Sequence, residues 1–320
     1  MSDKNKILIT GACGRLGTAL LPALAQKYGH MQVIASDAIK PDGQDIQNVR
    51  YVQLNVLDKS DMHSLVIREK VTQVYHLAAL LTAAGEKQPR QTWDLNMIGL
   101  QNVLDIAKCE NIRMFWPSSV AVFGSNSPRA ACPQFAVTEP ATIYGISKLA
   151  GELWCKYYHD HYGVDVRSVR YPGLIGDRNV TTGGTLEFAV QLFHEAMARR
   201  QYTCYLKPHT TLPFMYMPDA VKAALHLMDA PSAAIKVWSA YNLSALSFSP
   251  QELEHAICRH LPAFRVHYKH DSRQQIAETW PASIDDRHAR QDWGWMPAYD
   301  LQKMTQDMLH KLEKVNTQKI

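Results

Sequence analysis

The sequence predicts an α/β fold, with a doubly wound parallel sheet followed by a smaller, mixed α/β region. Short runs rich in β-branched residues alternate with helix-period segments over residues 1–170, which is typical of a parallel sheet covered by helices on both faces. A glycine-rich turn directly follows the first of these runs. After Pro172 the alternation weakens, because proline and glycine interrupt the chain more often. We therefore expect a first domain at 1–172 and a second region at 173–320, docked onto the carboxyl ends of the strands.

The individual elements follow from the same patterns. The β-branched runs predict strands at residues 6–10, 32–37, 51–56, 73–78, 114–119 and 165–171. Hydrophobic periodicity predicts helices at 16–28, 92–109 and 143–162, and later helices at 186–200, 218–228, 250–260 and 301–314. Strand and helix thus alternate along the first half, as the crossover connections of a parallel sheet require.

The composition fits a globular protein with a substantial core. Of the 320 residues, 46% are hydrophobic and 20% are charged, and 34 Lys and Arg against 30 Asp and Glu leave a net charge of +4. This charge is spread along the chain, so we expect no nucleic-acid partner. No apolar run approaches the roughly 18 to 20 residues of a membrane-spanning helix, which predicts no membrane association. The six cysteines show neither CxxC nor metal-ligand spacing, which predicts no metal site and reduced thiols in the cytoplasm.

The turn after the first predicted strand reads GACGRLG, with glycines at 11, 14 and 17. Glycine permits positive φ and lets the backbone approach a pyrophosphate, while the helix that follows offers unpaired N–H groups. Alone, this spacing fits an ordinary tight turn equally well. The flanking strand and helix, and the acidic residue described next, favour a Rossmann sheet that binds a dinucleotide. The residues expected to contact the cofactor in this turn are Gly11, Cys13, Gly14, Arg15, Leu16 and Gly17.

An acidic residue stands where a bound ribose requires one. Asp37 follows Gly17 by 20 positions and closes the second predicted strand, where a carboxylate accepts a hydrogen bond from the ribose 2′-OH. A carboxylate at this point repels the 2′-phosphate of NADP, so NAD is the predicted cofactor. Asp58 is a second candidate, for the adenine amino group, but it fits equally well as the N-cap of a helix over 60–69.

A tyrosine and a lysine four positions apart, Tyr144 and Lys148, open the predicted helix 143–162 and share one of its faces. A phenol has a pKa of about 10, so its use as a base near pH 7 requires the phenolate to be stabilised by roughly 2 to 3 units. A lysine one turn away and an oxidised nicotinamide both supply positive charge for this purpose. The tyrosine–lysine spacing alone is a weak signal. Ser119, at the end of the fifth predicted strand, supplies the hydroxyl that would orient the substrate oxygen and share its proton.

The motifs jointly resemble the extended short-chain dehydrogenase/reductase family. Besides the glycine turn, Asp37, Ser119 and the Tyr144–Lys148 pair, the resemblance rests on HLAA at 76–79 and on Asn96. Within this family the chain is similar to the short-chain L-threonine 3-dehydrogenases. The stretches that carry this narrower similarity are LLTAAGE at 80–86, WPSSVAVFG at 116–124, GGT at 183–185, LPFMYMPDA at 212–220 and WPAS at 280–283.

The resemblance implies a role for each matching residue. Tyr144 would be the general base, and Lys148 would lower its pKa and hold the nicotinamide ribose. Ser119 would bind the substrate hydroxyl, and Asn96 would support the lysine through a water. Further cofactor contacts would come from Leu77, Ala78 and Ala79. The amino-acid pocket would be lined by Thr82, Thr185, Leu186, Glu187 and Trp280.

The chain departs from the family pattern inside this pocket. The family is expected to have serine in place of Thr82, and a small residue followed by aspartate in place of Leu186 and Glu187. The larger Leu186 changes the pocket volume that sets side-chain specificity. Two of the pocket residues also have a simpler interpretation, because Thr82 can serve as a helix cap and Trp280 as a packing anchor.

The resemblance implies NAD-dependent oxidation of the 3-hydroxyl of L-threonine to 2-amino-3-oxobutanoate. It also implies a homodimer paired through the helices that contain Asn96 and Tyr144. Two alternatives stay open, which are a nucleotide-sugar epimerase or dehydratase with tightly held NAD, and a non-catalytic dinucleotide-sensing protein. A dehydratase would require an acidic pair beside Ser119, where Val120 and Ala121 stand, and a sensor would not require the tyrosine and lysine.

Overall fold

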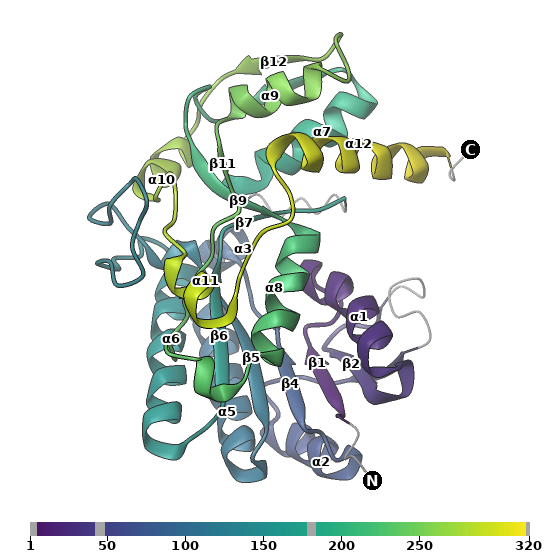
Figure 1. Ribbon diagram of the computed structural model, residues 1–320, viewed down its shortest axis with the longest axis vertical. Coiled ribbons are helices and arrows are strands. Elements are labelled where there is room, and N and C mark those ends of the chain that lie inside the picture. The colour runs from purple at the N-terminus through teal and green to yellow at the C-terminus, as the bar shows by residue number, and fades with distance from the viewer. Residues whose placement is uncertain (1–4, 42–48, 178–183, 318–320) are drawn as a thin grey trace.

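The larger layer of the protein is a seven-stranded parallel sheet (Figure 1). The computed structural model describes residues 5–41, 49–177 and 184–317, and their side chains apart from those of 82–84 and 315–317. The strands are β1 (Ile7–Thr10), β2 (Val33–Asp37), β3 (Arg50–Gln53), β4 (Gln73–His76), β5 (Arg113–Ser119), β6 (Val166–Tyr171) and β10 (Tyr241–Asn242). Their order is β10-β6-β5-β4-β1-β2-β3, so the order reverses between β1 and β4, where doubly wound sheets bind ligands. The predicted fold class is confirmed.

Helices cover both faces of this sheet (Figure 1). On one face, α1 (Arg15–Tyr28) and α8 (Met217–Asp229) share a hydrophobic core with β1 and β6. On the other face, α2 (Lys59–Glu69), α5 (Gly99–Glu110) and α6 (Ile143–Tyr162) form a second core. Because α8 and β10 follow residue 172, the second half of the chain completes this layer in addition to building its own region.

The smaller region lies at the upper end of the sheet in Figure 1. Its strands are β7 (Gly173–Ile175), β9 (Leu212–Tyr216) and β11 (Leu246–Phe248) in one sheet, and β8 (Gln201–Cys204) and β12 (Arg265–Tyr268) in another. Its helices are α7 (Phe188–Ala198), α9 (Pro250–Cys258), α10 (Arg273–Thr279) and α12 (Leu301–Thr317), while α11 (Arg287–Trp293) packs beside β10. A separate aromatic core, in which Phe214 stacks on Phe248, holds these elements together. Among the described helices, none is both long and apolar enough to cross a lipid bilayer.

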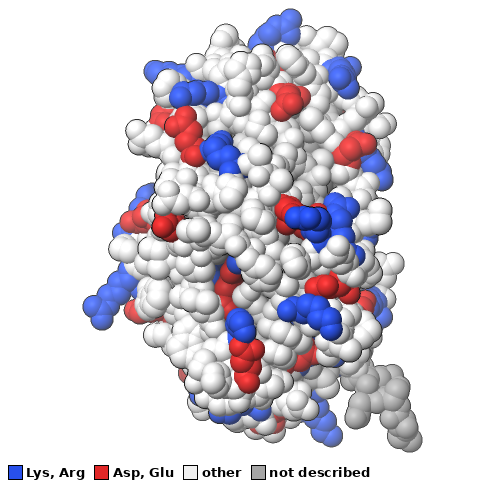
Figure 2. Space-filling model, turned by 60° about the vertical axis from the view of Figure 1, so that its left-hand side comes forward, with Lys and Arg blue, Asp and Glu red and all other residues white. Residues whose placement is uncertain are grey.

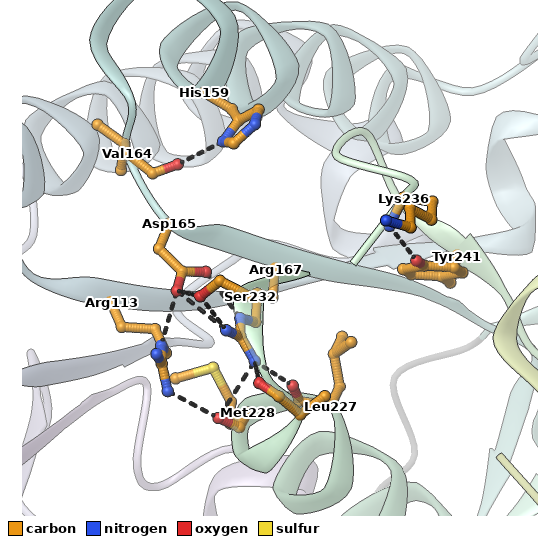
Figure 3. Close-up of polar contacts among 11 residues, drawn as sticks. Arg113, His159, Val164, Asp165, Arg167, Leu227, Met228, Ser232, Lys236 and Tyr241 are labelled. Carbon is orange, nitrogen blue, oxygen red and sulfur yellow. Dashed lines mark hydrogen bonds and ion pairs between the residues drawn. The ribbon is translucent and has the colours of Figure 1, made fainter. Parts of the chain in front are cut away.

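A buried arginine on β6 fastens α8 to the sheet (Figure 3). The Arg167 side chain is fully buried, and its guanidinium also binds the Asp165 carboxylate, which in turn accepts a hydrogen bond from Arg113. The last carbonyl groups of a helix have no partner within the helix. Arg167 satisfies several of them at distances of 2.6 to 3.3 Å, because its Nη1 donates to the carbonyl oxygens of Leu227, Met228 and Ala230.

Some predicted elements differ from the structure in their extent. The predicted helix 92–109 consists of α4 (Pro89–Trp93), a π-helical turn at Asp94–Ile98 and α5. The third strand ends at Gln53 rather than residue 56, because its partner β2 ends at Asp37, directly opposite Gln53. The fourth ends at His76 rather than residue 78, where the glycine turn crosses close to the backbone of Ala78.

Candidate active site

A cleft of about 470 Å³ opens where the strand order reverses. The turn after β1 and the segments that follow β4 and β5 form one side of it, and the start of the second region forms the other. It brings together residues from all three predicted groups, for cofactor, catalysis and substrate. The predicted residues that line it are Gly11, Gly14, Arg15, Leu16, Gly17, Leu77, Ala79, Ser119, Tyr144, Lys148, Thr185, Leu186, Glu187 and Trp280.

The cleft also contains residues for which the sequence analysis predicted no role in the site, although some of them lie in the stretches that carry the family resemblance. They are Leu80, Leu81, Pro117, Ser118, Val120, Ala121, Tyr171, Pro172, Gly173, Leu174 and Gly184. Most of them lie at or just after the carboxyl end of β4, β5 or β6. The carboxyl ends of adjacent parallel strands meet at one edge of the sheet, so strand position alone was a usable signal for them.

Other predicted residues lie outside the lining of this cleft as the structure describes it. They are Cys13, Asp37, Asp58, Ala78 and Asn96. The Asp58 carboxylate accepts a hydrogen bond of 3.0 Å from the Asp61 N–H and so caps α2, which was the alternative interpretation. Its role toward adenine stays a prediction. The Thr82 side chain lies outside the described residues, although the helix α3 (Thr82–Lys87) begins there.

The glycine turn is shaped to receive an anion. Gly11 has φ +72°, and a Cβ atom at this position would lie 2.5 Å from the Ala78 nitrogen, so no other residue fits. Gly14 begins α1 without a side-chain cap, and the first turn of this helix carries no acidic residue. The N–H groups and the positive end of the helix dipole are therefore available to a phosphate.

Asp37 is held beside this turn by the backbone. Its Oδ2 accepts a hydrogen bond of 3.0 Å from the Cys13 N–H, which fixes the carboxylate at the end of β2. The turn offers backbone N–H groups to an anion, and the neighbouring Asp37 carboxylate can accept a hydrogen bond from a hydroxyl. This arrangement fits the pyrophosphate and ribose of NAD.

Arg15 connects the glycine turn to the second region. Its Nη2 donates a hydrogen bond of 3.0 Å to the Leu174 carbonyl oxygen on β7. Burial lowers the pKa of Arg15, and the nearby Glu187 carboxylate acts in the opposite direction. The guanidinium therefore lies between the predicted pyrophosphate site and the predicted substrate pocket.

Tyr144 is positioned by the first turn of α6. Thr142 caps this helix by accepting a hydrogen bond of 3.0 Å from the Gly145 N–H. A side chain at Gly145 would collide with the Ala121 carbonyl oxygen, so glycine lets α6 approach the segment after β5 closely. This approach places Tyr144 and Ser119 together in the lining of the cleft. Burial raises the pKa of Tyr144 to about 12, and the nearby Ser119 hydroxyl opposes this rise.

Lys148 lies one helical turn beyond Tyr144 and is buried. Its Nζ donates a hydrogen bond of 2.7 Å to the Pro117 carbonyl oxygen and lies 4.4 Å from the centre of the Trp116 ring. The same nitrogen is 5.6 Å from the centre of the Tyr144 ring. Burial lowers the pKa of Lys148 to about 7, while Cys155 and Glu152 act to raise it.

Asn96 lies on the π-helical turn and is bound on both sides of its amide. Its Oδ1 accepts from the Leu80 N–H at 2.8 Å, and its Nδ2 donates to the Leu80 carbonyl oxygen at 3.1 Å and to the Ser147 hydroxyl at 3.0 Å. Asn96 therefore ties the segment after β4 to the residue that precedes Lys148. Its support of Lys148 through a water stays a prediction.

The far end of the cleft is formed by the second region. Thr185 and Glu187 lie on a short 3-10 turn before α7, and both are buried, as is Trp280 after α10. Leu186 is half-buried between them. Among the described residues that line the cleft, Glu187 is the one carboxylate, and Arg15 and Lys148 are the cations.

Comparison with known proteins agrees with this geometry. Residues 7–243 match the NAD dependent epimerase/dehydratase family. The mitochondrial L-threonine 3-dehydrogenase of Bos taurus is 40% identical over 310 residues, which cover 97% of this chain and 83% of that protein. A solved structure of a GalE-like L-threonine dehydrogenase from Cupriavidus necator, in its holo form, is 47% identical with a TM-score of 0.93, covering 96% of this chain and 99% of that chain. A monomeric L-threonine 3-dehydrogenase from a metagenome database, in its apo form, is 44% identical with a TM-score of 0.92, covering 97% and 99% of the two chains.

The extended short-chain dehydrogenase/reductase resemblance is therefore confirmed, and with it the use of NAD by an enzyme that acts on a small molecule. The chain belongs to the NAD dependent epimerase/dehydratase family.

Proposed function

We propose that this enzyme oxidises the 3-hydroxyl of L-threonine to 2-amino-3-oxobutanoate with NAD. The observation that carries the proposal is that Tyr144, Ser119 and Lys148 line one cleft that begins at the glycine turn, with Lys148 one helical turn from Tyr144. The relatives that are 40% and 47% identical bear the name of this activity, and both align over nearly the whole chain.

Tyr144 is proposed as the group that takes the hydroxyl proton, at its phenolic oxygen. In the cofactor-free chain its pKa of about 12 keeps the phenol neutral near pH 7, so the site needs added positive charge before Tyr144 can act as a base. NAD, when bound, supplies a positively charged ring and the carbon that accepts the hydride. Lys148 in its charged form, 5.6 Å from the centre of the Tyr144 ring, would stabilise the phenolate by its positive charge. The Ser119 hydroxyl would hold the substrate oxygen beside Tyr144.

The cofactor is proposed to lie along residues of the first half of the chain. The glycine turn and the free N–H groups of α1 would hold the pyrophosphate, and Asp37 would accept from the adenosine ribose. Residues 1–172 then form the NAD-binding domain, and 173–320 mainly form the substrate-binding region, although α8 and β10 belong to the larger layer.

The amino-acid end of the substrate is proposed to face the 3-10 turn before α7. A buried carboxylate suits an ammonium group, so Glu187 is the proposed partner of the α-ammonium. Thr185 and Trp280 would close the pocket around the rest of the substrate. Leu186 would fill the space that a smaller residue leaves open in the family pattern.

A homodimer is proposed, paired through α6 and the neighbouring helices. Apolar side chains on the outer faces of these elements are exposed, among them Leu153 at 61% and Tyr157 at 44% on α6, and Trp93 at 39% on α4. Figure 2 turns the α6 side of the molecule forward and shows scattered charges between broad uncharged areas. Leu153→Glu should convert the dimer to a monomer in sedimentation velocity, whereas a wild-type protein that already sediments as a monomer would contradict the proposal.

The cytoplasm is the proposed compartment. The six cysteines all lie in the described residues and none of them forms a disulfide, which suits a reducing environment.

The activity is tested by supplying NAD and following the absorbance of reduced cofactor with L-threonine, D-threonine, L-serine and UDP-sugars in turn. We expect reduction with L-threonine and little or none with the other compounds. Conversion of a UDP-sugar without net reduction of NAD, together with no response to L-threonine, would replace this proposal with an epimerase.

A further inference from the structure

A buried carboxylate lies one turn beyond Lys148 on α6, at Glu152, which is 1% exposed. Its Oε1 accepts hydrogen bonds from the Ser118 hydroxyl at 2.5 Å and from Arg170 Nε at 2.8 Å. Its Oε2 accepts from Arg170 Nη2 at 2.7 Å. Ser118 lies between Ser119 and Pro117, whose carbonyl oxygen accepts a hydrogen bond from Lys148, so Glu152 is bound to the residue that connects them.

We propose that Glu152, paired with Arg170, is a positioning residue for the proposed reaction, which sets the local charge beneath Tyr144 and Lys148 and fixes the serine segment through Ser118. This inference rests on the proposed function. It concerns residues that do not touch the reacting atoms, because the cleft is lined by Ser118 and Lys148 and neither Glu152 nor Arg170 is among the lining residues that the structure describes.

Several elements place titratable or polar groups beside the Glu152–Arg170 pair. On α6, the Glu152 charge raises the pKa of both Lys148 and the Cys155 thiol. Lys148 in turn lowers the pKa of Cys155, and Cys155 raises that of Lys148. From β5 the facing group is Ser118, and from β6 it is Arg170. The remaining nitrogen of Arg170 donates to the Gln134 carbonyl oxygen at 2.9 Å and to Asn242 Oδ1 at 3.1 Å, and its guanidinium lies 5.2 Å from the centre of the Phe123 ring.

The charges of the pair nearly cancel only while both partners are present. Without Glu152, the positive charge of Arg170 remains buried below the site and favours the phenolate form of Tyr144. Without Arg170, the negative charge of Glu152 remains and disfavours the phenolate. A purely structural pair would instead lower activity in both cases without moving the pH dependence in opposite directions.

The test compares Glu152→Gln and Arg170→Gln in the NAD-loaded enzyme. The measurement is the pH dependence of kcat/KM for L-threonine. Glu152 lies eight residues beyond Tyr144, or about 12 Å along the helix axis. At that separation we expect the acid limb of the profile to move to lower pH by roughly half to one unit in Glu152→Gln, and to higher pH by a similar amount in Arg170→Gln. The double variant should return the limb to the wild-type position. Shifts of the same sign, or no shift in either variant, would overturn the proposal.

A second readout does not depend on turnover. The near-ultraviolet absorbance of the Tyr144 phenolate, taken as the difference between each NAD-loaded protein and the same protein carrying Tyr144→Phe, should titrate with the same opposite shifts. If the wild type fails to oxidise L-threonine, the proposed function fails while this titration still decides the role of Glu152. Arg167→Gln is the matched control, because it removes a buried arginine from the other face of β6 and should leave the titration unchanged.

Ser118→Ala provides a milder variant if a glutamine variant does not fold. It removes one hydrogen bond to Glu152 and no charge. We expect kcat to fall roughly fivefold, the cost of one buried hydrogen bond, with the acid limb in place. A wild-type kcat in this variant would contradict the link from Glu152 to the serine segment.

Discussion

Two buried arginines on β6 are used in different ways. Arg167 and Arg170 are three positions apart, so they face opposite sides of the sheet. Arg167 points to the α8 side, where it binds Asp165 and three backbone carbonyls near the beginning of the strand (Figure 3). Arg170 points to the α6 side, where it binds Glu152 beneath the cleft.

The difference lies in what each arginine's partners touch. The partners of Arg167 are the end of a helix and a carboxylate whose side chain is 24% exposed, so this cluster holds α8 against the sheet. The partner of Arg170 is a carboxylate that is almost fully buried and lies one turn from Lys148. Arg167 therefore anchors α8 near the beginning of β6, whereas Arg170 contributes to the electrostatics of the cleft near the end of the same strand.

The largest effect on the cleft side is expected at Tyr144 itself. Tyr144→Phe removes the proton acceptor and leaves the ring, so turnover of L-threonine should fall by about a hundred- to ten-thousand-fold. The dissociation constant of NAD, measured by fluorescence titration, should stay near the wild-type value. Turnover close to the wild-type value would exclude Tyr144 as the base. It would also remove the basis for assigning Arg170 and Glu152 an electrostatic role in catalysis.

On the anchoring side, Arg167→Met should lower the free energy of unfolding by about 3 kcal/mol. The substitution leaves Asp165 and the carbonyls at the end of α8 without their main donor. Urea denaturation measures the change, and kcat/KM as a function of pH should keep its wild-type shape. A displaced pH profile in this variant would break the distinction between the two arginines.

Asp37 offers a test on the cofactor side of the cleft. Asp37→Asn keeps an oxygen for the Cys13 N–H but removes the charge that repels a 2′-phosphate. The preference for NAD over NADP should narrow by about tenfold, which corresponds to roughly 1.4 kcal/mol. The ratio of the two dissociation constants checks this, and an unchanged ratio would exclude Asp37 as the discriminating group.

The smallest effect expected is a gain of stability from Lys148→Met in the cofactor-free chain. Burial lowers the pKa of Lys148 to about 7, below its unfolded value of about 10.4, so the charged lysine destabilises the folded state. This penalty is fully present below pH 7 and disappears as the pH rises toward 10. The free energy of unfolding of the variant, measured by urea denaturation, should therefore be about 1 kcal/mol higher than that of the wild type at pH 6. The gain should be smaller at pH 9. A loss of stability at pH 6 would show that the charged lysine is supported better than its burial implies.

Much of the larger layer was predictable because its signals are local. The predicted helix 143–162 coincides with α6, whose ends are marked by the Thr142 cap and by Gly163, which has φ +70°. The glycine turn was found from the spacing of its three glycines, and Tyr144 from its four-residue spacing to Lys148 on one helix. In both cases the spacing along the chain sets the distance between the groups. The π-helical turn at 94–98 was not predicted, and its Asn96 side chain makes hydrogen bonds to Leu80 and Ser147, which lie 16 and 51 positions away along the chain.

The substrate end of the cleft and the Glu152–Arg170 pair depend on distant contacts. Glu187 and Trp280 line one cleft although 93 positions separate them, and no local pattern places them together. Arg170 meets Glu152 because β6 returns alongside α6. One local signal was available for Glu152, because it continues the four-residue spacing of Tyr144 and Lys148 on the same helical face.

The central claim is that the cleft removes hydride from the alcohol carbon of L-threonine. The most direct measurement uses NAD with L-threonine deuterated at C3, followed by mass spectrometry of the reduced cofactor. We predict that the reduced cofactor gains one mass unit from this substrate and none from L-threonine deuterated at C2. Reduced cofactor that carries no label from C3 would contradict the proposed reaction.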